Sequence, residues 1–253
     1  MRIRASVAVV SGALALSALA VPAARADGSQ GDTRITKVVV DGGNRVRIGT
    51  SGAVTVKVGV TVTDTSGIKG AEDEFEIYGP DGGNATTGKP SCTKVDATTS
   101  TCVGSVRIDP RTDHLSDKSA GTWYVDAWIN ANDDDYLWKE KAGSFSFQRA
   151  ARLTADAAPE PVEKGGTITV TGALSRADWE SLAYAGYGSQ SVKLQFRKKN
   201  AIGYTTVKTV EADSKGSLKT TVEASADGYY RYSFGGDSGT AAVNSAGDFI
   251  DVK

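Results

Sequence analysis

Carboxylate and amide side chains crowd together in the stretch "NANDDDYLW", which runs from Asn130 to Trp138. Such oxygen-bearing groups are the ligands that calcium ions prefer in proteins. An EF-hand loop starting at Asn130 would need glycine at its sixth position and glutamate at its twelfth. The sequence has Asp135 and Lys141 at those positions, which excludes an EF-hand.

Two interpretations of this stretch remain. Asp133, Asp134 and Asp135 could bind calcium in a loop between β-strands, with the weak affinity of open extracellular sites, on the order of 10⁻⁴–10⁻³ M. Alternatively, the Asn and Asp residues simply build a turn between two strands, with their charges held apart in solvent. The turn is the favoured interpretation; the protein is expected to need no cofactor, and calcium is the one alternative.

Catalytic groups are scarce. The single histidine, His114, lies near Asp113 and Ser116, but a Ser-His-Asp triad depends on spatial geometry that closeness in sequence does not provide. A zinc hydrolase would usually need more than one histidine. The chain also lacks a glycine-rich phosphate loop between a strand and a helix. We therefore expect a protein that is not an enzyme; a hydrolase using carboxylates such as those of "GAEDEFEIYG" is the lesser alternative.

Two cysteines occur, Cys92 and Cys102. Their spacing is not that of a redox or zinc pair, and an oxidising compartment favours a disulfide between them. The loop between them is short, so loop-closure entropy limits the stabilisation to roughly 3 kcal/mol.

The N-terminus has the pattern of a secretory signal peptide. A basic "MRIR" precedes the apolar run "ASVAVVSGALALSALAV" and the small-residue segment "AARA", which ends at Ala26. No later stretch has the roughly 20 apolar residues that a membrane-spanning helix requires. Residues 1–26 are therefore predicted to be cleaved, giving a secreted, extracellular protein without membrane insertion.

The charge of the mature chain argues against a nucleic-acid partner. Cleavage removes Arg2, Arg4 and Arg25, which leaves 26 basic against 30 acidic residues and a net charge of −4. Binding to nucleic acid depends on clustered Lys and Arg side chains against phosphate.

Alternating apolar and polar residues predict β-strands throughout. In "AVTVKVGVTVTD", valines occupy every second position from Val54 to Val62, which is typical of a strand with one buried face. Similar runs are separated by turn-forming residues, including "GPDGGN" and a predicted hairpin turn at Asp213–Gly216. Helix is expected only as one or two turns in "SRADWESLAYAG", with Ser175 as the N-cap.

Two series of about seven strands predict two tandem immunoglobulin-like β-sandwich domains, over residues 32–149 and 152–253. Both series place a small residue and glycine before an aromatic-rich strand, in "SAGTWYVDAW" and "SADGYYRYSF". This pattern resembles the start of the penultimate strand of immunoglobulin-like domains, which implies that Trp123 and Tyr230 form the corner contacts.

Ligand recognition is expected in loops at the sandwich ends. Trp179, Tyr184 and Tyr187 could form an aromatic platform for a glycan or cell-wall polymer; alternatively, one or two of them close the end of the second core. A surface protein is a third class of partner, and a spacer or scaffold role without any ligand is the alternative function.

Several segments together resemble one family. The run from "AGTWYVDAWINANDDDYLWKEKAGSFSFQRAARLT" through "APEPVEKGGTITVTGAL" and "YAGYGSQSVKLQFRKK" to "YTTVKTV" is similar to secreted actinobacterial proteins with two immunoglobulin-like domains. The resemblance covers most of the mature chain and implies an extracytoplasmic protein of a Gram-positive filamentous bacterium. Some members carry a calcium-binding label, but no functional residue transfers from them.

Overall fold

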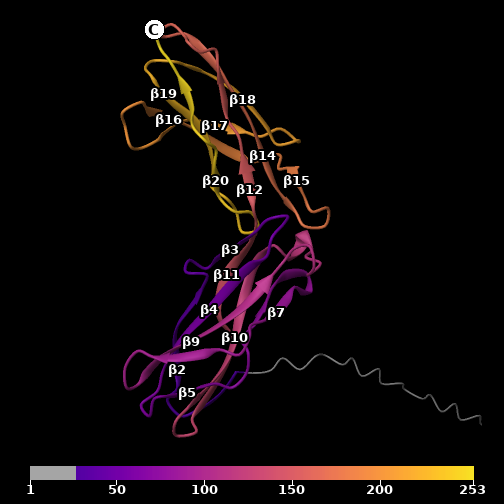
Figure 1. Ribbon diagram of the computed structural model, residues 1–253, viewed down its shortest axis with the longest axis vertical. Coiled ribbons are helices and arrows are strands. Elements are labelled where there is room, and N and C mark those ends of the chain that lie inside the picture. The colour runs from indigo at the N-terminus through magenta and orange to yellow at the C-terminus, as the bar shows by residue number, and fades with distance from the viewer. Residues whose placement is uncertain (1–26) are drawn as a thin grey trace, which may run out of the picture.

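The computed structural model describes residues 27–253, and the predicted signal peptide lies outside them. Two strand-rich bodies follow one another along a bent molecule (Figure 1). Residues 27–253 contain no α-helix, only the short 3-10 turns η1 (Pro80–Gly82) and η2 (Asp117–Ser119). None of the described segments is a helix with the length and hydropathy needed to cross a membrane.

The first body is a sandwich of two sheets. One sheet has the order β2-β4-β9-β8. Its strands are β2 (Arg34–Val40), β4 (Val54–Thr63), β9 (Thr99–Ile108) and β8 (Ser91–Lys94). The other sheet has the order β1-β11-β10-β6-β7, with β3 beside β11 and β5 beside β10. Its strands are β1 (Gly28–Gln30), β3 (Arg45–Ile48), β5 (Ile68–Ala71), β6 (Glu76–Tyr78), β7 (Asn84–Thr86), β10 (Gly121–Ala131) and β11 (Tyr136–Arg149).

This connectivity is immunoglobulin-like. The order β2-β4-β9-β8 reproduces the A-B-E-D sheet, and β11-β10 with β5 and β6 reproduces the G-F-C sheet. Consecutive segments β2 and β3 lie on opposite sheets, and β3 runs parallel to the last strand, β11. The predicted fold class is therefore confirmed by the strand order.

The second body repeats the plan. One side carries β12 (Ala151–Leu153), β13 (Asp156–Ala158), β14 (Thr167–Asp178), β15 (Ala183–Gly186) and β18 (Ser217–Glu223). The other side carries β17 (Thr205–Glu211), β16 (Ser191–Lys198), β19 (Gly228–Phe234), β20 (Val243–Asn244) and β21 (Asp248–Ile250). In the first of these sheets, β14 is central and pairs with β12, β13, β15 and β18. In the second, β16 pairs with β17 and β19, and β19 pairs with β20 and β21.

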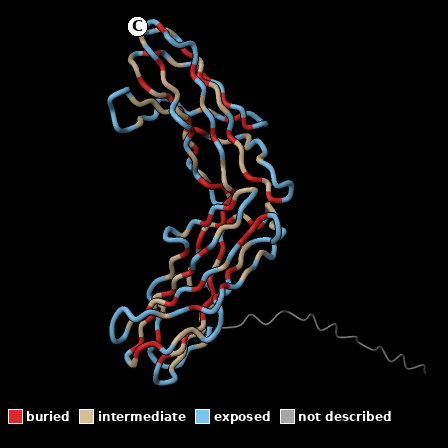
Figure 2. Tube along the Cα trace, viewed as in Figure 1, coloured by how far each residue is buried: buried red, intermediate tan, exposed pale blue. Residues whose placement is uncertain are grey.

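Alternation along the strands produces the two cores. Val56, Val58, Val60 and Val62 of β4 are fully buried, because every second side chain faces the opposite sheet. Each such burial stabilises the fold by about 1.5–3 kcal/mol. One apolar cluster fills the first sandwich and a second fills the other, and Figure 2 shows buried residues along the inside of both bodies. The first sandwich begins before residue 32, the predicted start of the first domain, because β1 (Gly28–Gln30) already pairs with β11.

The predicted disulfide is confirmed. Cys92 of β8 and Cys102 of β9 are direct cross-strand partners and are bonded to each other. The bond therefore fixes the edge strand β8 to its neighbour.

Two local predictions need correction. "SRADWESLAYAG" forms no helix but the hairpin of β14 and β15, because strand pairing across the hairpin outweighs local helix preference. The turn at Asp213–Gly216 is present, with the Asp213 carboxylate accepting hydrogen bonds from the backbone N–H groups of Lys215 and Ser217, each at 2.8 Å. It is not a hairpin turn, since β17 pairs with β16 and β18 pairs with β14.

The corner contact exists in the first sandwich. The indole Nε1 of Trp123, near the start of β10, donates to the carbonyl oxygen of Ser119 at 2.7 Å, four residues upstream. In the second sandwich the equivalent contact is different. Tyr230 packs its ring on Phe196, with centroids 4.7 Å apart, while Tyr232 donates its hydroxyl across the core to the carbonyl of Val170 at 2.9 Å.

Candidate functional site

The two sandwiches are joined by Trp179, which lies in the turn between β14 and β15. Its side chain is 2% exposed and belongs to the core of the first sandwich, although the strands that carry it belong to the second. The ring lies 5.4 Å from that of Phe147, and Nε1 donates to the carbonyl of Ile48 at 3.3 Å. The indole therefore fixes one sandwich against the other.

An ion pair between buried Arg149 and half-buried Asp117 lies beside this indole. Arg149, at the end of β11, donates Nε to the carbonyl of Ala177 and pairs with the carboxylate of Asp117. Burial raises the pKa of Asp117 even though Arg149 opposes the shift, and burial lowers the pKa of Arg149. Both residues belong to the first sandwich, so the link to the second comes from their other hydrogen bonds: Arg149 Nε donates to the carbonyl of Ala177, and the Asp117 carboxylate accepts from the backbone N–H of Trp179 at 2.8 Å.

A loop of the second sandwich, residues 235–242, is attached to the same strand end. The backbone N–H of Arg149 donates to Gly239 at 2.9 Å, and its carbonyl accepts from Ala241 at 3.0 Å. Gln148 Nε2 donates to the carbonyl of Asp237 at 2.6 Å. Contacts on two sides of β11 therefore hold the junction in one arrangement.

Asp237 organises the loop internally. One oxygen of its carboxylate accepts from the backbone N–H groups of Gly239 and Thr240, at 2.8 and 2.7 Å. The other accepts from the hydroxyl of Tyr187 at 2.5 Å. Burial raises the pKa of Tyr187, and the Asp237 carboxylate adds to this shift, so the hydroxyl remains a donor. Both oxygens of the Asp237 carboxylate therefore accept hydrogen bonds, one from the loop itself and the other from Tyr187 next to β15.

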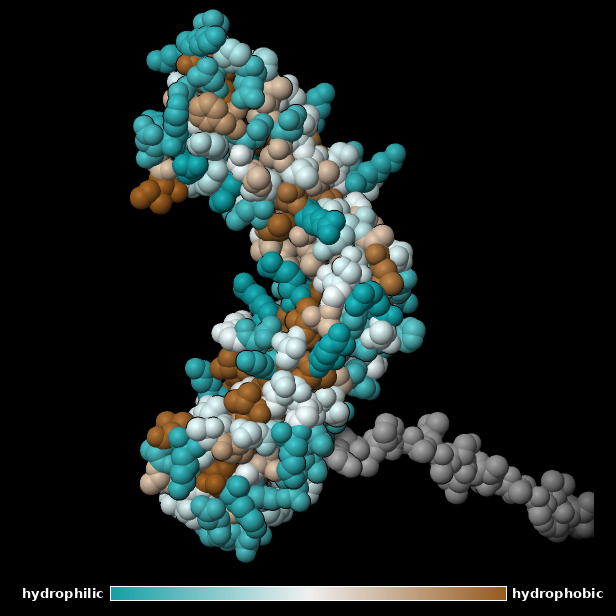
Figure 3. Space-filling model, in the orientation of Figure 1, coloured by the Kyte–Doolittle hydropathy of each residue, from teal (hydrophilic) through white to brown (hydrophobic). Residues whose placement is uncertain are grey.

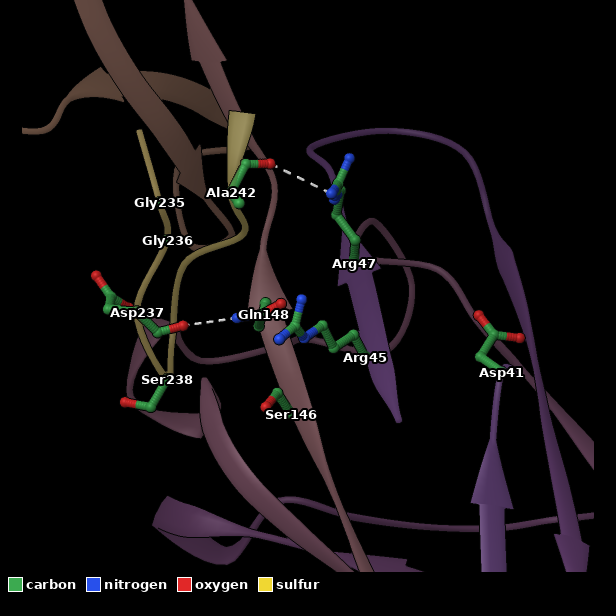
Figure 4. A pocket seen from close by; sticks show the side chains of 10 residues that line it. All are labelled: Asp41, Arg45, Arg47, Ser146, Gln148, Gly235, Gly236, Asp237, Ser238 and Ala242. Carbon is green, nitrogen blue, oxygen red and sulfur yellow. Dashed lines mark hydrogen bonds between the residues drawn. The ribbon is translucent and has the colours of Figure 1, made fainter. Parts of the chain in front are cut away.

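A polar crevice of about 550 Å³ lies between this loop and the first sandwich (Figure 4). One wall is β3, which contributes Arg45 and Arg47, and the other is the loop segment Gly235–Ser238. Ser146 and Gln148 of β11 form its floor. Figure 3 shows that the concave side of the molecule is hollowed between the two sandwiches, with hydrophilic side chains projecting into the hollow.

The crevice presents hydrogen-bond donors that the protein itself does not use. In the part of the chain that the structure describes, the guanidinium of Arg45 has neither a hydrogen bond nor an ion pair, and that of Arg47 makes one bond, from Nη2 to the carbonyl of Ala242 at 3.3 Å. A guanidinium carries five N–H donors and no acceptor. A second hollow of about 560 Å³ shares Arg47, Gly235 and Ala242 and extends the surface along the second sandwich.

The predicted aromatic platform differs from the observed arrangement. Trp179 is buried, so it presents no face to a ligand, and it closes the first core, not the second. The guanidinium of Arg152 covers the ring of Tyr184 at 3.6 Å, and that of Arg176 covers Tyr187 at 4.0 Å. The three rings do not form one exposed surface, because the hairpin that carries them folds against its neighbours; ligand contact by the two tyrosines stays a prediction.

The stretch after Asn130 forms the favoured turn between β10 and β11. Ala131 N–H donates to the carbonyl of Asp135 at 2.8 Å, and the Asp133 carboxylate accepts from Asp135 N–H at 3.3 Å. Asp134 has a positive φ of 68° and lies 3.6 Å from Lys69 Nζ. Asn and Asp residues tolerate this left-handed conformation better than most.

Asp135 approaches two carboxylates that are distant in sequence. Oxygens of Asp32, Asp64 and Asp135 lie within 4.8 Å of one another, whereas Asp133 and Asp134 are not part of this group. Burial acts to raise the pKa of Asp64, but hydrogen bonds from Ser66 and Thr33 outweigh it and leave that pKa lowered. The sequence identified one of the three members; the others come from separate loops and carry no local signal.

Calcium binding at this end of the sandwich stays a prediction, and its test follows from the geometry. Because the turn is already closed by its own hydrogen bonds, we expect the thermal unfolding curve to be the same in millimolar calcium and in chelator. A calcium-dependent rise that Asp135→Asn abolishes and the matched Asp133→Asn retains would assign an ion to the cluster of Asp32, Asp64 and Asp135 instead.

The structure brings no catalytic triad together within residues 27–253. His114 is exposed, while Ser116 Oγ lies 3.4 Å from Glu180 and Asp117 pairs with Arg149. The neighbours of the histidine in sequence are therefore engaged elsewhere.

Comparison with known proteins found no matching family model and no matching curated protein. Among solved structures, a cytokine receptor complex is 13% identical over 85% of this chain and 96% of that chain, with a TM-score of 0.36. Three N-terminal domains of the outer capsid protein Hoc of bacteriophage RB49 are 12% identical over 87% and 70%, with a TM-score of 0.32. The human OSCAR ligand-binding domain is 11% identical over 85% and 94%, with a TM-score of 0.24. These values carry no functional argument.

Proposed function

We propose that the protein is a secreted, non-catalytic binding module that recognises a surface component through the crevice between its sandwiches. One observation supports this above the others: Arg45 and Arg47 keep donors unpaired at the wall of a crevice whose shape is fixed by buried contacts. The strand and the loop that form the crevice are already held in place, so binding has to order only the side chains, which limits the entropic cost.

The site takes a polar ligand. Its lining consists mainly of charged, hydroxyl, amide and glycine residues, so an apolar small molecule would find little surface to bury. The ligand classes expected from the sequence, a cell-wall polymer, a glycan or a surface protein, all present polar groups. Secretion is supported by the predicted signal peptide together with the Cys92–Cys102 bond, since disulfides persist in oxidising compartments.

The second candidate is a spacer or scaffold. The buried Trp179, together with the hydrogen bonds from Arg149 to Ala177 and from Trp179 to Asp117, gives the two sandwiches a fixed relative orientation, which is what a rigid spacer requires. A spacer does not need unpaired arginines in its concave side, so the binding function is preferred.

Pull-down of bacterial cell-wall material and a glycan array will test the proposal. We expect the wild type to bind, and Ser238→Trp to reduce binding roughly tenfold or more, because a large side chain would fill the crevice. Ser214→Trp, at an exposed turn of the second sandwich, is the matched control and should bind normally. Absence of binding by the wild type would favour the spacer, and equal binding by both variants would place recognition elsewhere.

A further inference from the structure

We infer that the crevice selects an oxyanion, a phosphate or carboxylate group of a surface polymer, which Arg45 and Arg47 bind directly; this deepens the proposed function and rests on it. The geometry of β3 is the first support. Val46 and Ile48 of this strand are fully buried, so the alternate residues Arg45 and Arg47 project together from the other face. The two Cα atoms are about 7 Å apart by strand geometry.

The two guanidinium groups address different parts of the crevice. Figure 4 shows Arg45 extending toward Gln148 and the loop at Asp237, while Arg47 extends toward Ala242. A ligand with anionic groups repeated along a chain can therefore meet one guanidinium after the other. Guanidinium and oxyanion pair through two parallel N–H···O bonds, which makes arginine more selective for these groups than lysine.

The acidic residues of the lining do not pair with these two guanidinium groups. Asp237 lines the crevice, but its carboxylate is committed to the backbone of Gly239 and Thr240 and to Tyr187. Figure 4 places Asp41 at the far edge, beyond β3. Neither forms an ion pair with the two arginines in the described part of the chain.

The opposite wall allows close approach. A Cβ atom added at Gly235 would meet nothing within 4 Å, so packing does not require glycine there, and the bare backbone leaves room for a ligand. At Gly236 the φ is +77°, and a Cβ would lie 2.7 Å from the backbone nitrogen of Ala242, so the turn itself requires glycine. The hydroxyls of Ser146 and Ser238 add two further donors to the lining.

Inorganic phosphate and acetate are the probes for the site itself, followed through the side-chain Nε–H signals of arginine by NMR. We expect phosphate to shift the signals of Arg45 and Arg47 and to leave that of the distant Arg34 unchanged. The shifts of Arg45 and Arg47 should become smaller as the salt concentration is raised. Arg45→Gln/Arg47→Gln should weaken phosphate binding about tenfold or more, and Arg45→Lys/Arg47→Lys should retain part of it. The control Arg34→Gln/Arg107→Gln removes the same charge from exposed positions and should bind as the wild type does.

Polymers then distinguish the sources of the anion. Wild-type protein is expected to bind a phosphate-bearing or a carboxylate-bearing polymer and not the neutral polymer of equal length. Unchanged arginine signals in phosphate, or equal losses in the two Gln double variants, would overturn the inference. Binding of neutral polymer that Ser238→Trp blocks and the arginine variants keep would leave the proposed function standing while refuting anion selection. Arginine signals that respond to phosphate, in a protein that binds no surface material, would refute the proposed function alone.

Discussion

Trp179→Ala will destabilise the first sandwich by about 3–5 kcal/mol, the range for truncating a fully buried tryptophan. The residue belongs by sequence to the second sandwich, but its indole is 2% exposed within the first core, against Phe147. Truncation leaves a cavity there and removes the hydrogen bond to the carbonyl of Ile48. Urea unfolding followed by far-UV circular dichroism measures the loss.

Two further substitutions make this prediction specific. Trp179→Phe should cost less than the alanine variant, because it keeps much of the packing while leaving the Ile48 carbonyl without its donor. Ile202→Ala is the control for loss of a large apolar side chain, since Ile202 is 101% exposed and should change stability by no more than about 0.5 kcal/mol. If Trp179→Ala unfolds at the same urea concentration as Ile202→Ala, the indole does not join the sandwiches as described.

Trp123→Ala is expected to have an effect of similar size, about 3–5 kcal/mol. The indole is buried in the first core, 4.4 Å from the ring of Phe147, and its Nε1 donates to the carbonyl of Ser119 at the corner. Gly79 is adapted to it, since a Cβ there would lie 2.3 Å from the indole. Unfolding in urea again provides the measurement.

The matched control for Trp123 lies on the same strand. Trp128 of β10 is only half-buried, so Trp128→Ala should cost clearly less. Trp123→Phe should cost about 1–3 kcal/mol, because the buried carbonyl of Ser119 loses its partner while most packing remains. Equal effects of Trp123→Ala and Trp128→Ala would contradict the corner role.

Both predictions bear on function through the junction. The crevice wall at Arg45 and Arg47 belongs to the first sandwich, and the facing loop belongs to the second. A variant that loosens Trp179 while both sandwiches stay folded should therefore lose crevice binding along with the fixed angle.

Local patterns in the sequence were sufficient for the strands, the sandwich class and the disulfide. Alternation from Val54 to Val62 specifies a buried face, because side chains of a strand point to opposite sides in turn. Two cysteines on neighbouring strands in an oxidising compartment have one available partner each. The turn after Asn130 was likewise predictable, because Asn and Asp residues favour it whatever lies around them.

Only the tertiary structure decided the junction and its crevice. The sequence around Trp179 is that of an aromatic in a loop, and nothing in it predicts the contact with Phe147. Likewise, nothing in the sequence around Asp135 predicts that its carboxylate lies close to those of Asp32 and Asp64. Arg45 and Arg47 carried no motif either; their significance arises when β3 meets a loop almost two hundred residues later in the chain, at Ala242. The periodicity of apolar residues indicates which face of a strand is buried, since that depends on neighbours one or two residues away. A contact between distant segments depends instead on how complete sandwiches pack, and no local pattern of residues predicts it.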